Sequence, residues 1–210
     1  GMGFGDLNAD GRPDIILPAG WFEQPEDPWS ALWAWHPEFD LGPSCGVPAL
    51  CHDVNADGLP DIIAGQGHAY GLAWWEQQKD KNGNRSWLKH DIDSDRSQYH
   101  DTQLVDIDND GQLELLTGKR YRAHSGHDPG SNDPIGLYYF EINAAGFQRV
   151  TIDYGPPTQA SGAGIYTWVA DINSDGWKDI IAPGKEGLYL FRNLGPMDAP
   201  SCVSESSDKH

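Results

Sequence analysis

The stretch DINSDGWKDII, residues 171–181, decides the fold, because the sequence contains three more segments of the same form. They read DLNADGRPDII from Asp6, DVNADGLPDII from Asp53 and DIDNDGQLELL from Asp106. In all four segments an oxygen-bearing side chain stands at positions 1, 3, 5 and 9, and glycine stands at position 6. Self-similarity of this kind indicates a protein built from repeated structural units.

The alternating acids of these segments predict loops that bind calcium. Ca²⁺ takes about six to eight oxygen ligands at roughly 2.3–2.6 Å, and the glycine permits the positive φ that a tight loop requires. Asp, Asn and Gly are also ordinary turn formers, but four filled quartets favour the metal. Position 12, where an EF-hand needs glutamate, holds Leu17, Ala64, Thr117 and Ala182, so the loops are not EF-hands. We expect about four Ca²⁺ ions, held by Asp6, Asn8, Asp10, Asp14, Asp53, Asn55, Asp57, Asp61, Asp106, Asp108, Asp110, Glu114, Asp171, Asn173, Asp175 and Asp179.

Short apolar segments around each loop predict β-strands, and no stretch has helical periodicity. An aromatic segment such as GLAWWEQ (residues 71–77) follows each loop, and a further apolar segment such as WLKHDI (residues 87–92) follows in turn. The pattern predicts an all-β protein, a β-propeller of about four four-stranded antiparallel blades, with the calcium loop between the first and second strands of each blade. The expected blades are residues 3–40, 47–93, 100–153 and 164–194, and residues 195–210 are expected to form a flexible C-terminal tail.

The units resemble the VCBS/FG-GAP repeat family over roughly residues 3–194. The resemblance implies a β-propeller with Ca²⁺ in the loop of each blade, and it extends distantly to propellers of the integrin type and of the aldos-2-ulose dehydratase type. Because such propellers serve adhesion, carbohydrate binding and catalysis, the resemblance implies the fold more firmly than the function.

The sequence allows three arrangements of the blades. The chain can form a closed or nearly closed four-blade unit, which we favour, or part of a larger ring. In the third arrangement two chains pair into an eight-bladed ring, so that the protein is a homodimer.

Composition excludes two classes of partner. The 210 residues include 32 acids and 14 Lys or Arg, a formal charge of −18. A surface of this sign repels phosphate backbones, so we expect no nucleic-acid partner. No apolar run approaches the ~18 residues of a membrane span. Calcium sites of the extracellular type bind weakly, at about 10⁻⁴–10⁻³ M, which predicts a secreted, periplasmic or cell-surface location.

The face opposite the calcium loops carries the candidate functional residues. The third unit has a long insert, GKRYRAHSGHDPGSNDPIG from Gly118, which is rich in basic and proton-transferring side chains. Neighbouring loops of other units should reach the same face. The candidate catalytic residues are His68, His100, Tyr121, Arg122, His124 and His127. The candidate ligand-binding residues are Tyr70, Tyr99, Lys119, Arg120 and Lys185.

These residue types suit acid–base chemistry on a sugar, because His or Tyr can move a proton while Arg or Lys stabilises a carboxylate or enolate. We therefore expect a carbohydrate-binding or carbohydrate-processing protein, whose enzymatic form would be a lyase or dehydratase acting by β-elimination. A non-catalytic adhesion module that binds an extracellular protein is the first alternative. A transition-metal enzyme using His68, His100, His124 and His127 is the second, and a purely structural polar loop explains the same residues.

The three cysteines do not pair evenly. Cys51 is expected to be a small buried side chain on an innermost strand, and a Cys45–Cys202 disulfide is one possible pairing.

Overall fold

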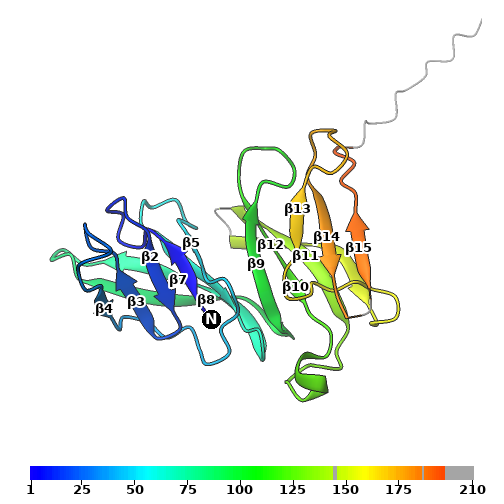
Figure 1. Ribbon diagram of the computed structural model, residues 1–210, viewed down its shortest axis with the longest axis horizontal. Helices are drawn as coiled ribbons and strands as arrows, with labels where there is room; N and C mark the ends of the chain where they lie inside the picture. Colours follow the sequence, from blue (N-terminus) through cyan, green and yellow to red (C-terminus); the bar gives the residue numbers. More distant parts are fainter. Residues whose placement is uncertain (144–145, 186, 197–210) are drawn as a thin grey trace, which may run out of the picture.

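A computed structural model describes residues 1–143, 146–185 and 187–196, and in these residues the chain is all-β. Its strands form four antiparallel sheets, shown in Figure 1. Blade 1 contains β1 (Gly3–Gly5), β2 (Asp14–Leu17), β3 (Gly20–Glu23) and β4 (Ala34–His36). Blade 2 contains β5 (Leu50–His52), β6 (Asp61–Gly65), β7 (Tyr70–Lys79) and β8 (Arg85–Ser97). Blade 3 contains β9 (Tyr99–Val105), β10 (Glu114–Lys119), β11 (Ile135–Asn143) and β12 (Gly146–Gly155). Blade 4 contains β13 (Trp168–Ala170), β14 (Asp179–Pro183) and β15 (Leu188–Phe191).

The order of strands within each sheet follows the chain, as in the blades of a propeller. Every acidic segment joins the first strand of a blade to the second, as the sequence predicts. Blade 4 has three strands among the described residues, and its sequence likewise shows no segment for a fourth, outer strand. The one helical element of the described chain is a short 3₁₀ segment, Ala123–Gly126, and no described helix has the length and apolarity to cross a membrane.

Each sheet has two apolar faces, because side chains alternate along a strand. We call the face toward the preceding blade the leading face and the face toward the following blade the trailing face. In blade 2, Ile62 lies on the leading face and packs with blade 1. Its neighbour Ile63 lies on the trailing face and packs with blade 3. In blade 3, Leu116 packs with Ile180 of blade 4. Three apolar cores therefore join four blades in a row.

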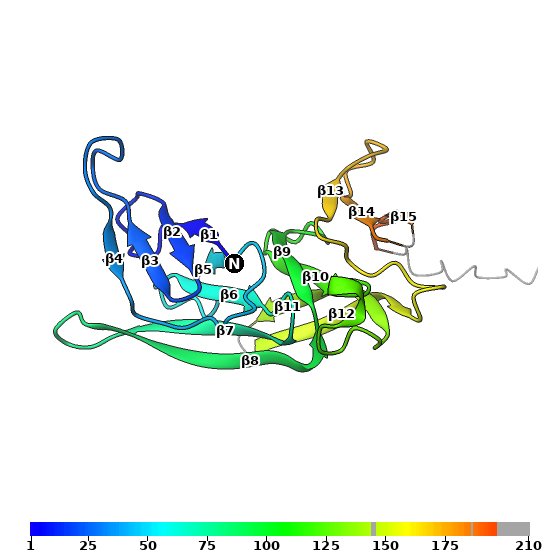
Figure 2. The ribbon, with the colours of Figure 1, turned by 60° about the horizontal axis from the view of Figure 1, so that its bottom comes forward.

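The four blades form an open arc and not the closed or nearly closed unit that the sequence favours. In Figure 2 blades 1 and 4 stand at opposite ends of the arc. No described residue covers their outer faces, with Phe4 of blade 1 63% exposed and Trp168 of blade 4 59% exposed. Each apolar core forms between sequential blades, and the described residues form no core between blade 4 and blade 1.

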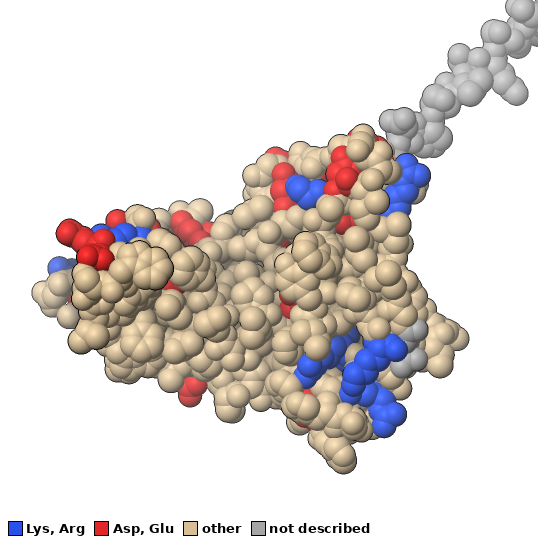
Figure 3. Space-filling model, viewed as in Figure 1, with Lys and Arg blue, Asp and Glu red and all other residues tan. Residues whose placement is uncertain are grey.

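Charged side chains are distributed unevenly between the two edges of the arc. In Figure 1 the loop between β13 and β14 lies at the top, whereas the loop between β10 and β11 lies at the bottom. Figure 3 shows acidic side chains along the upper edge and a group of basic side chains at the lower right. The acidic loops and the long insert of blade 3 lie at opposite edges, because antiparallel strands return alternate connections to opposite edges.

Two further expectations concern the ends and the cysteines. Cys51 is half-buried on β5 and packs against the core between blades 1 and 2. Cys45 is buried. The proposed partner Cys202 and most of the expected tail, residues 197–210, lie outside the described residues.

Candidate functional site

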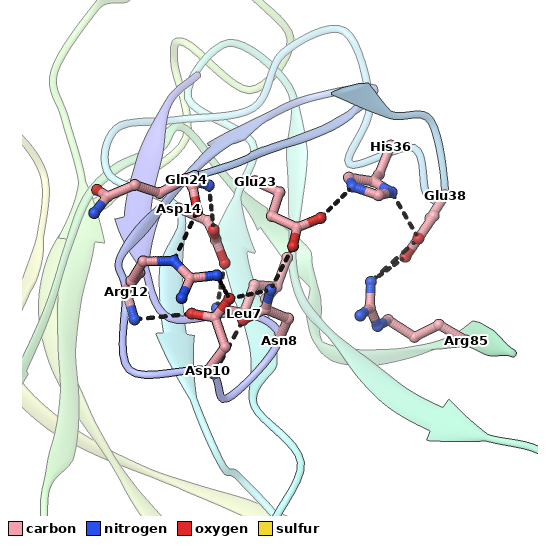
Figure 4. A network of polar contacts seen from close by, with 10 residues as sticks. All are labelled: Leu7, Asn8, Asp10, Arg12, Asp14, Glu23, Gln24, His36, Glu38 and Arg85. Atoms are coloured by element: carbon pink, nitrogen blue, oxygen red, sulfur yellow. Dashed lines mark hydrogen bonds and ion pairs between the residues drawn. The ribbon is translucent and has the colours of Figure 1, made fainter. Parts of the chain in front are cut away.

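The acidic loops of blades 1, 2 and 4 share one hydrogen-bond pattern, and blade 3 keeps the part of it in which the Gly111 N–H donates to Asp106 at 3.2 Å. Figure 4 shows other contacts of the blade 1 loop, around Asn8, Asp10 and Asp14. The Asp6 carboxylate accepts hydrogen bonds from the backbone N–H groups of Asp10, at 3.0 Å, and Gly11, at 2.8 Å. The same contacts recur from Asp53 in blade 2 and Asp171 in blade 4. The glycine at position 6 has φ between 85° and 91° in all four loops, as predicted. This pattern holds the oxygens of positions 1, 3 and 5 on one tight turn.

The acid at position 9 is buried and ties the loop to the blade. Asp61 accepts hydrogen bonds from the backbone N–H groups of Val54, at 3.0 Å, and Gln77, at 2.7 Å. Burial raises the pKa of Asp61 to about 6, and it raises the pKa of Glu114, its equivalent in blade 3, to about 7. Nearby loop carboxylates add to both shifts. The position-9 acid therefore connects the loop to the neighbouring strand, and it also adds negative charge to the loop.

These donor sets fit a hard divalent cation. In blade 3, oxygens of Asp106, Asp108 and Glu114 lie within 4.8 Å of one another, and Asp106 Oδ1 is buried without a hydrogen-bond partner. Crowded carboxylates of this kind repel one another unless a cation neutralises them. The residues that would hold such an ion are the predicted loop ligands, and calcium would supply charge neutralisation and cross-linking of the loop.

On the opposite face, three separate segments bring polar side chains together. His68 lies in the β6–β7 connection, His100 lies on β9, and Arg120, His124 and Asp128 follow β10 in the long insert of blade 3. The insert turns sharply at the 3₁₀ segment, where His124 has a positive φ of 46°. This strained turn places the imidazole of His124 against that of His68.

Asp128 is the centre of this group, which we call the His–Asp–Arg cluster and which consists of His68, His100, Arg120, His124 and Asp128. The two Asp128 oxygens contact Nδ1 of His68 at 2.9 Å and Nδ1 of His124 at 3.0 Å. Burial opposes ionisation of Asp128, but the hydrogen bonds from His68 and His124 outweigh it and hold its pKa below the usual range. The contacts leave Nε2 of His124 free of the carboxylate.

Arg120 and His100 complete the cluster. The Arg120 guanidinium lies 2.9 Å from Nδ1 of His68 and 3.9 Å from Asp128. The His100 ring lies edge-on to His68, with 5.9 Å between centroids. Burial, together with the charges of Arg120 and His68, lowers the pKa of His100 to about 4. His100 is therefore neutral at neutral pH, beside a fixed positive charge.

A pocket of about 660 Å³ opens beside the cluster, between blades 3 and 4. Blade 3 contributes Arg120, Tyr121 and His124, and blade 4 contributes Lys185. Tyr166 and Trp168 form an aromatic wall, with their rings edge-to-face at 5.1 Å. The pocket thus combines positive charge, a candidate proton acceptor and exposed aromatic rings.

One segment of the chain matches a known repeat family. Residues 53–117 form an FG-GAP-like repeat. This segment runs from the loop of blade 2 through most of β10 and so covers one full structural period. A comparison with curated proteins gives no match for the chain. The expected resemblance is confirmed for residues 53–117, and the loop geometry of blades 1 and 4 repeats that of the FG-GAP-like segment. FG-GAP-like repeats often bind Ca²⁺.

Outside the repeat motif, the structure brings only part of the predicted set together. His68, His100, Arg120 and His124 meet in the cluster, and Tyr121 and Lys185 line the pocket. Lys185 Nζ also donates to the carbonyl oxygen of Arg122 at 2.9 Å. The exposed His127 does not join the group of His68, His124 and Asp128 that share ligand distances. The second alternative of four histidines around one metal is therefore not the arrangement observed.

Two predicted ligand-binding residues are buried in the blades instead of facing a ligand. Tyr99 is fully buried, and its hydroxyl donates to Asp93 Oδ2 at 2.9 Å. Lys119 is also buried, 3.3 Å from Gln98 Oε1. Both lie on regular strands whose alternation turns them inward. Tyr70 is exposed, and its hydroxyl donates a hydrogen bond of 2.7 Å to Asp133, outside the cluster.

Sequence reasoning missed Asp128 and the aromatic wall. Asp128 is one of 32 acids, so composition does not distinguish it. Its position in HSGHDPG, directly after two histidines, was the available signal. Trp168 stands on an innermost strand, where the default expectation is packing, and only the open trailing face of blade 4 exposes it.

Proposed function

We propose that the chain is a calcium-stabilised propeller module that binds an acidic carbohydrate at the His–Asp–Arg cluster and breaks it by β-elimination. The observation that carries the proposal is the Asp128–His124 pair, because His124 lines the same pocket as Arg120, Lys185 and an aromatic wall. Exposed aromatic rings suit the apolar faces of sugar rings, and Arg and Lys suit a carboxylate substituent.

The elimination assigns one role to each group. His124 Nε2 takes the proton on the carbon next to the sugar carboxylate, while Asp128 holds the imidazole in the required tautomer. Arg120 and Lys185 stabilise the enolate that forms. The electron pair then forms the carbon–carbon double bond and expels the oxygen substituent on the next carbon, which takes a proton from Tyr121. No oxidant or reductant is needed.

The calcium part of the proposal rests on the loops. One Ca²⁺ in each loop neutralises the crowded carboxylates and fixes the connections at one edge of the arc. Because weak calcium sites fill only where calcium is abundant, the same proposal places the protein in a secreted, periplasmic or cell-surface setting.

The test is turnover of oligosaccharides that contain uronic acids, in buffer with calcium. Elimination gives an unsaturated sugar that absorbs ultraviolet light, so the reaction is followed directly. Arg120→Ala should abolish turnover and weaken binding measured by calorimetry, whereas Lys89→Ala, which removes an exposed charge from β8, should change neither. Binding of a protein partner with no affinity for any acidic sugar would favour the adhesion alternative instead.

A transition-metal site is the second candidate, because ligand atoms of His68, His124 and Asp128 lie within 4.8 Å of one another. Imidazole and carboxylate together suit Zn²⁺. The guanidinium of Arg120, at 2.9 Å from His68 Nδ1, opposes a second positive charge there and makes the metal-free network our preferred reading. Elemental analysis of the purified protein decides between them: stoichiometric zinc retained through dialysis would replace the elimination mechanism with a metal-assisted one.

A further inference from the structure

The two ends of the arc repeat the faces that pack between blades. On the trailing face of blade 4, Trp168, Ile181 and Leu190 stand side by side in register. Leu50, Ile63 and Trp74 stand at the same register positions in blade 2, where they pack in the core with blade 3. Leu190 is 60% exposed, although its counterparts are covered. The trailing face of blade 4 therefore has the composition of an interface between blades, although no described residue packs on it.

The leading face of blade 1 is its counterpart. Phe4, Ile15 and Phe22 stand side by side in register, at the positions that Cys51, Ile62 and Trp75 occupy in blade 2. The blade 2 residues pack against blade 1. In blade 1 the same row faces outward, with Phe4 exposed at the end of the arc.

The second residue of each acidic loop shows the same difference. Leu7 is fully buried in the core between blades 1 and 2, and Ile107 is buried in the core between blades 3 and 4. Val54 packs against the core between blades 2 and 3. Ile172, at this position in blade 4, is 48% exposed. The loops of blades 1, 2 and 3 thus each insert an apolar residue into the following interface. The loop of blade 4 carries such a residue as well, but the described residues form no interface around it.

A side-chain hydrogen bond crosses two of the three interfaces between blades. Gln77 of blade 2 donates from Nε2 to the carbonyl oxygen of Leu7, at 3.0 Å. Asn193 of blade 4 donates from Nδ2 to the carbonyl oxygen of Ile107, at 2.8 Å. Gln24 holds the equivalent position in blade 1, since the position-9 acid accepts its backbone N–H as it does in the other two blades. Its carboxamide points away from the loop in Figure 4 and makes no hydrogen bond to a described residue.

We propose that two copies of this chain associate head to tail into an eight-bladed ring. The trailing face of blade 4 in each copy packs on the leading face of blade 1 in the other. The occupant is a second copy because the chain itself carries both halves of an interface that it forms three times internally. In Figure 2 the two end blades rise on the same side of the arc, which leaves that side open for the second arc. A head-to-tail contact of this kind gives a closed assembly when the rotation completes a turn.

The new interface also reaches the candidate site. Trp168 lies on the trailing face and lines the pocket beside Arg120 and His124. Blade 1 of the second copy would therefore supply the missing wall of that pocket. The dimer goes beyond the proposed function, because it follows from the register of the blades whether or not the pocket binds a sugar.

The first experiment is light scattering after size exclusion of the full chain in calcium buffer, over a wide range of concentration. The expected mass is twice the 23.1 kDa of the chain. A monomer throughout the range, or a series of larger open oligomers, would overturn the proposal.

The second experiment uses one charge on each face. Leu190→Asp and Phe4→Asp should each give monomers, whereas Leu88→Asp, at an exposed position on β8, should remain dimeric. Circular dichroism shows whether each variant folds. If Leu190→Asp or Phe4→Asp does not fold, Leu188→Asp on the trailing face or Trp35→Asp on the leading face takes its place. An equimolar mixture of the two end variants should recover a heterodimer, because one intact interface is left between them. Self-association of Phe4→Asp alone, or no heterodimer in the mixture, would contradict head-to-tail pairing.

Discussion

The imidazole rings of His68 and His124 stack with 4.5 Å between their centroids and 10° between their planes. They come from different blades, and a single carboxylate, Asp128, contacts Nδ1 of each. The stack therefore depends on one charge that is held between two rings. Asp128→Asn keeps the shape but offers one oxygen and one amide nitrogen, so one ring loses its acceptor. We expect turnover of an acidic sugar to fall by about 10²–10⁴-fold, with a small change in melting temperature because the insert is a surface loop.

The two histidines of the insert should behave differently. His124 contacts Asp128 and lines the pocket, whereas His127 is exposed and outside the cluster. His124→Ala should abolish turnover, and His127→Ala should leave it within about twofold of the parent protein. Steady-state kinetics of the two variants measure this directly. Equal loss in both would mean that the whole insert, and not the cluster, forms the site.

Sequence and structure agree where the chemistry is local. The loops, the strands around them and the order of the blades follow from a repeated pattern of eleven residues, because loop ligands and strand alternation depend on near neighbours. Tyr99 and Lys119 were misplaced because the β-strand turns them into the blade, and no local signal distinguishes an inward from an outward residue at a strand end. The open arc could not be predicted either, since it depends on how far each blade is rotated from the last.

Calcium removal should destabilise the fold. With sites of about 10⁻⁴–10⁻³ M, a calcium concentration 10 to 100 times the dissociation constant stabilises the native state by roughly 1.4–2.7 kcal/mol per site. Excess chelator should therefore lower the melting temperature markedly in differential scanning calorimetry. Asp57→Asn, which weakens the loop of blade 2, should reduce the calcium-dependent part of that shift. Asp91→Asn, on an exposed outer strand, is the matched control and should leave it intact.

Lys119 gives a pH-dependent contribution to stability. Burial lowers the pKa of Lys119 from 10.5 to about 8, so the unfolded chain binds a proton that the folded chain releases between these values. Stability should thus rise as pH increases from about 8 to 10.5, and below pH 8 the charged, buried amine costs up to about 3 kcal/mol. Lys119→Met should increase the free energy of unfolding at pH 7 and remove this slope. Urea denaturation at a series of pH values tests it, and an unchanged slope in the variant would show that the amine is solvated.

Gln77 and Gln24 occupy equivalent positions but should respond to substitution in different ways. Gln77 is buried and donates to the Leu7 carbonyl inside one chain, so Gln77→Ala leaves that carbonyl unpaired and should lower the free energy of unfolding by about 1–3 kcal/mol. In the proposed dimer, the Gln24 carboxamide would face the carbonyl oxygen of Ile172 in the second copy. Gln24→Ala should therefore weaken dimerisation by about tenfold or more while the monomer unfolds at the same denaturant concentration. Sedimentation equilibrium measures the first quantity and chemical denaturation of dilute protein the second. If Gln24→Ala destabilised the monomer and left association unchanged, the carboxamide would have its partner within the chain. The end faces would then lack the hydrogen bond that the internal interfaces have, and this part of the argument for the dimer would be wrong.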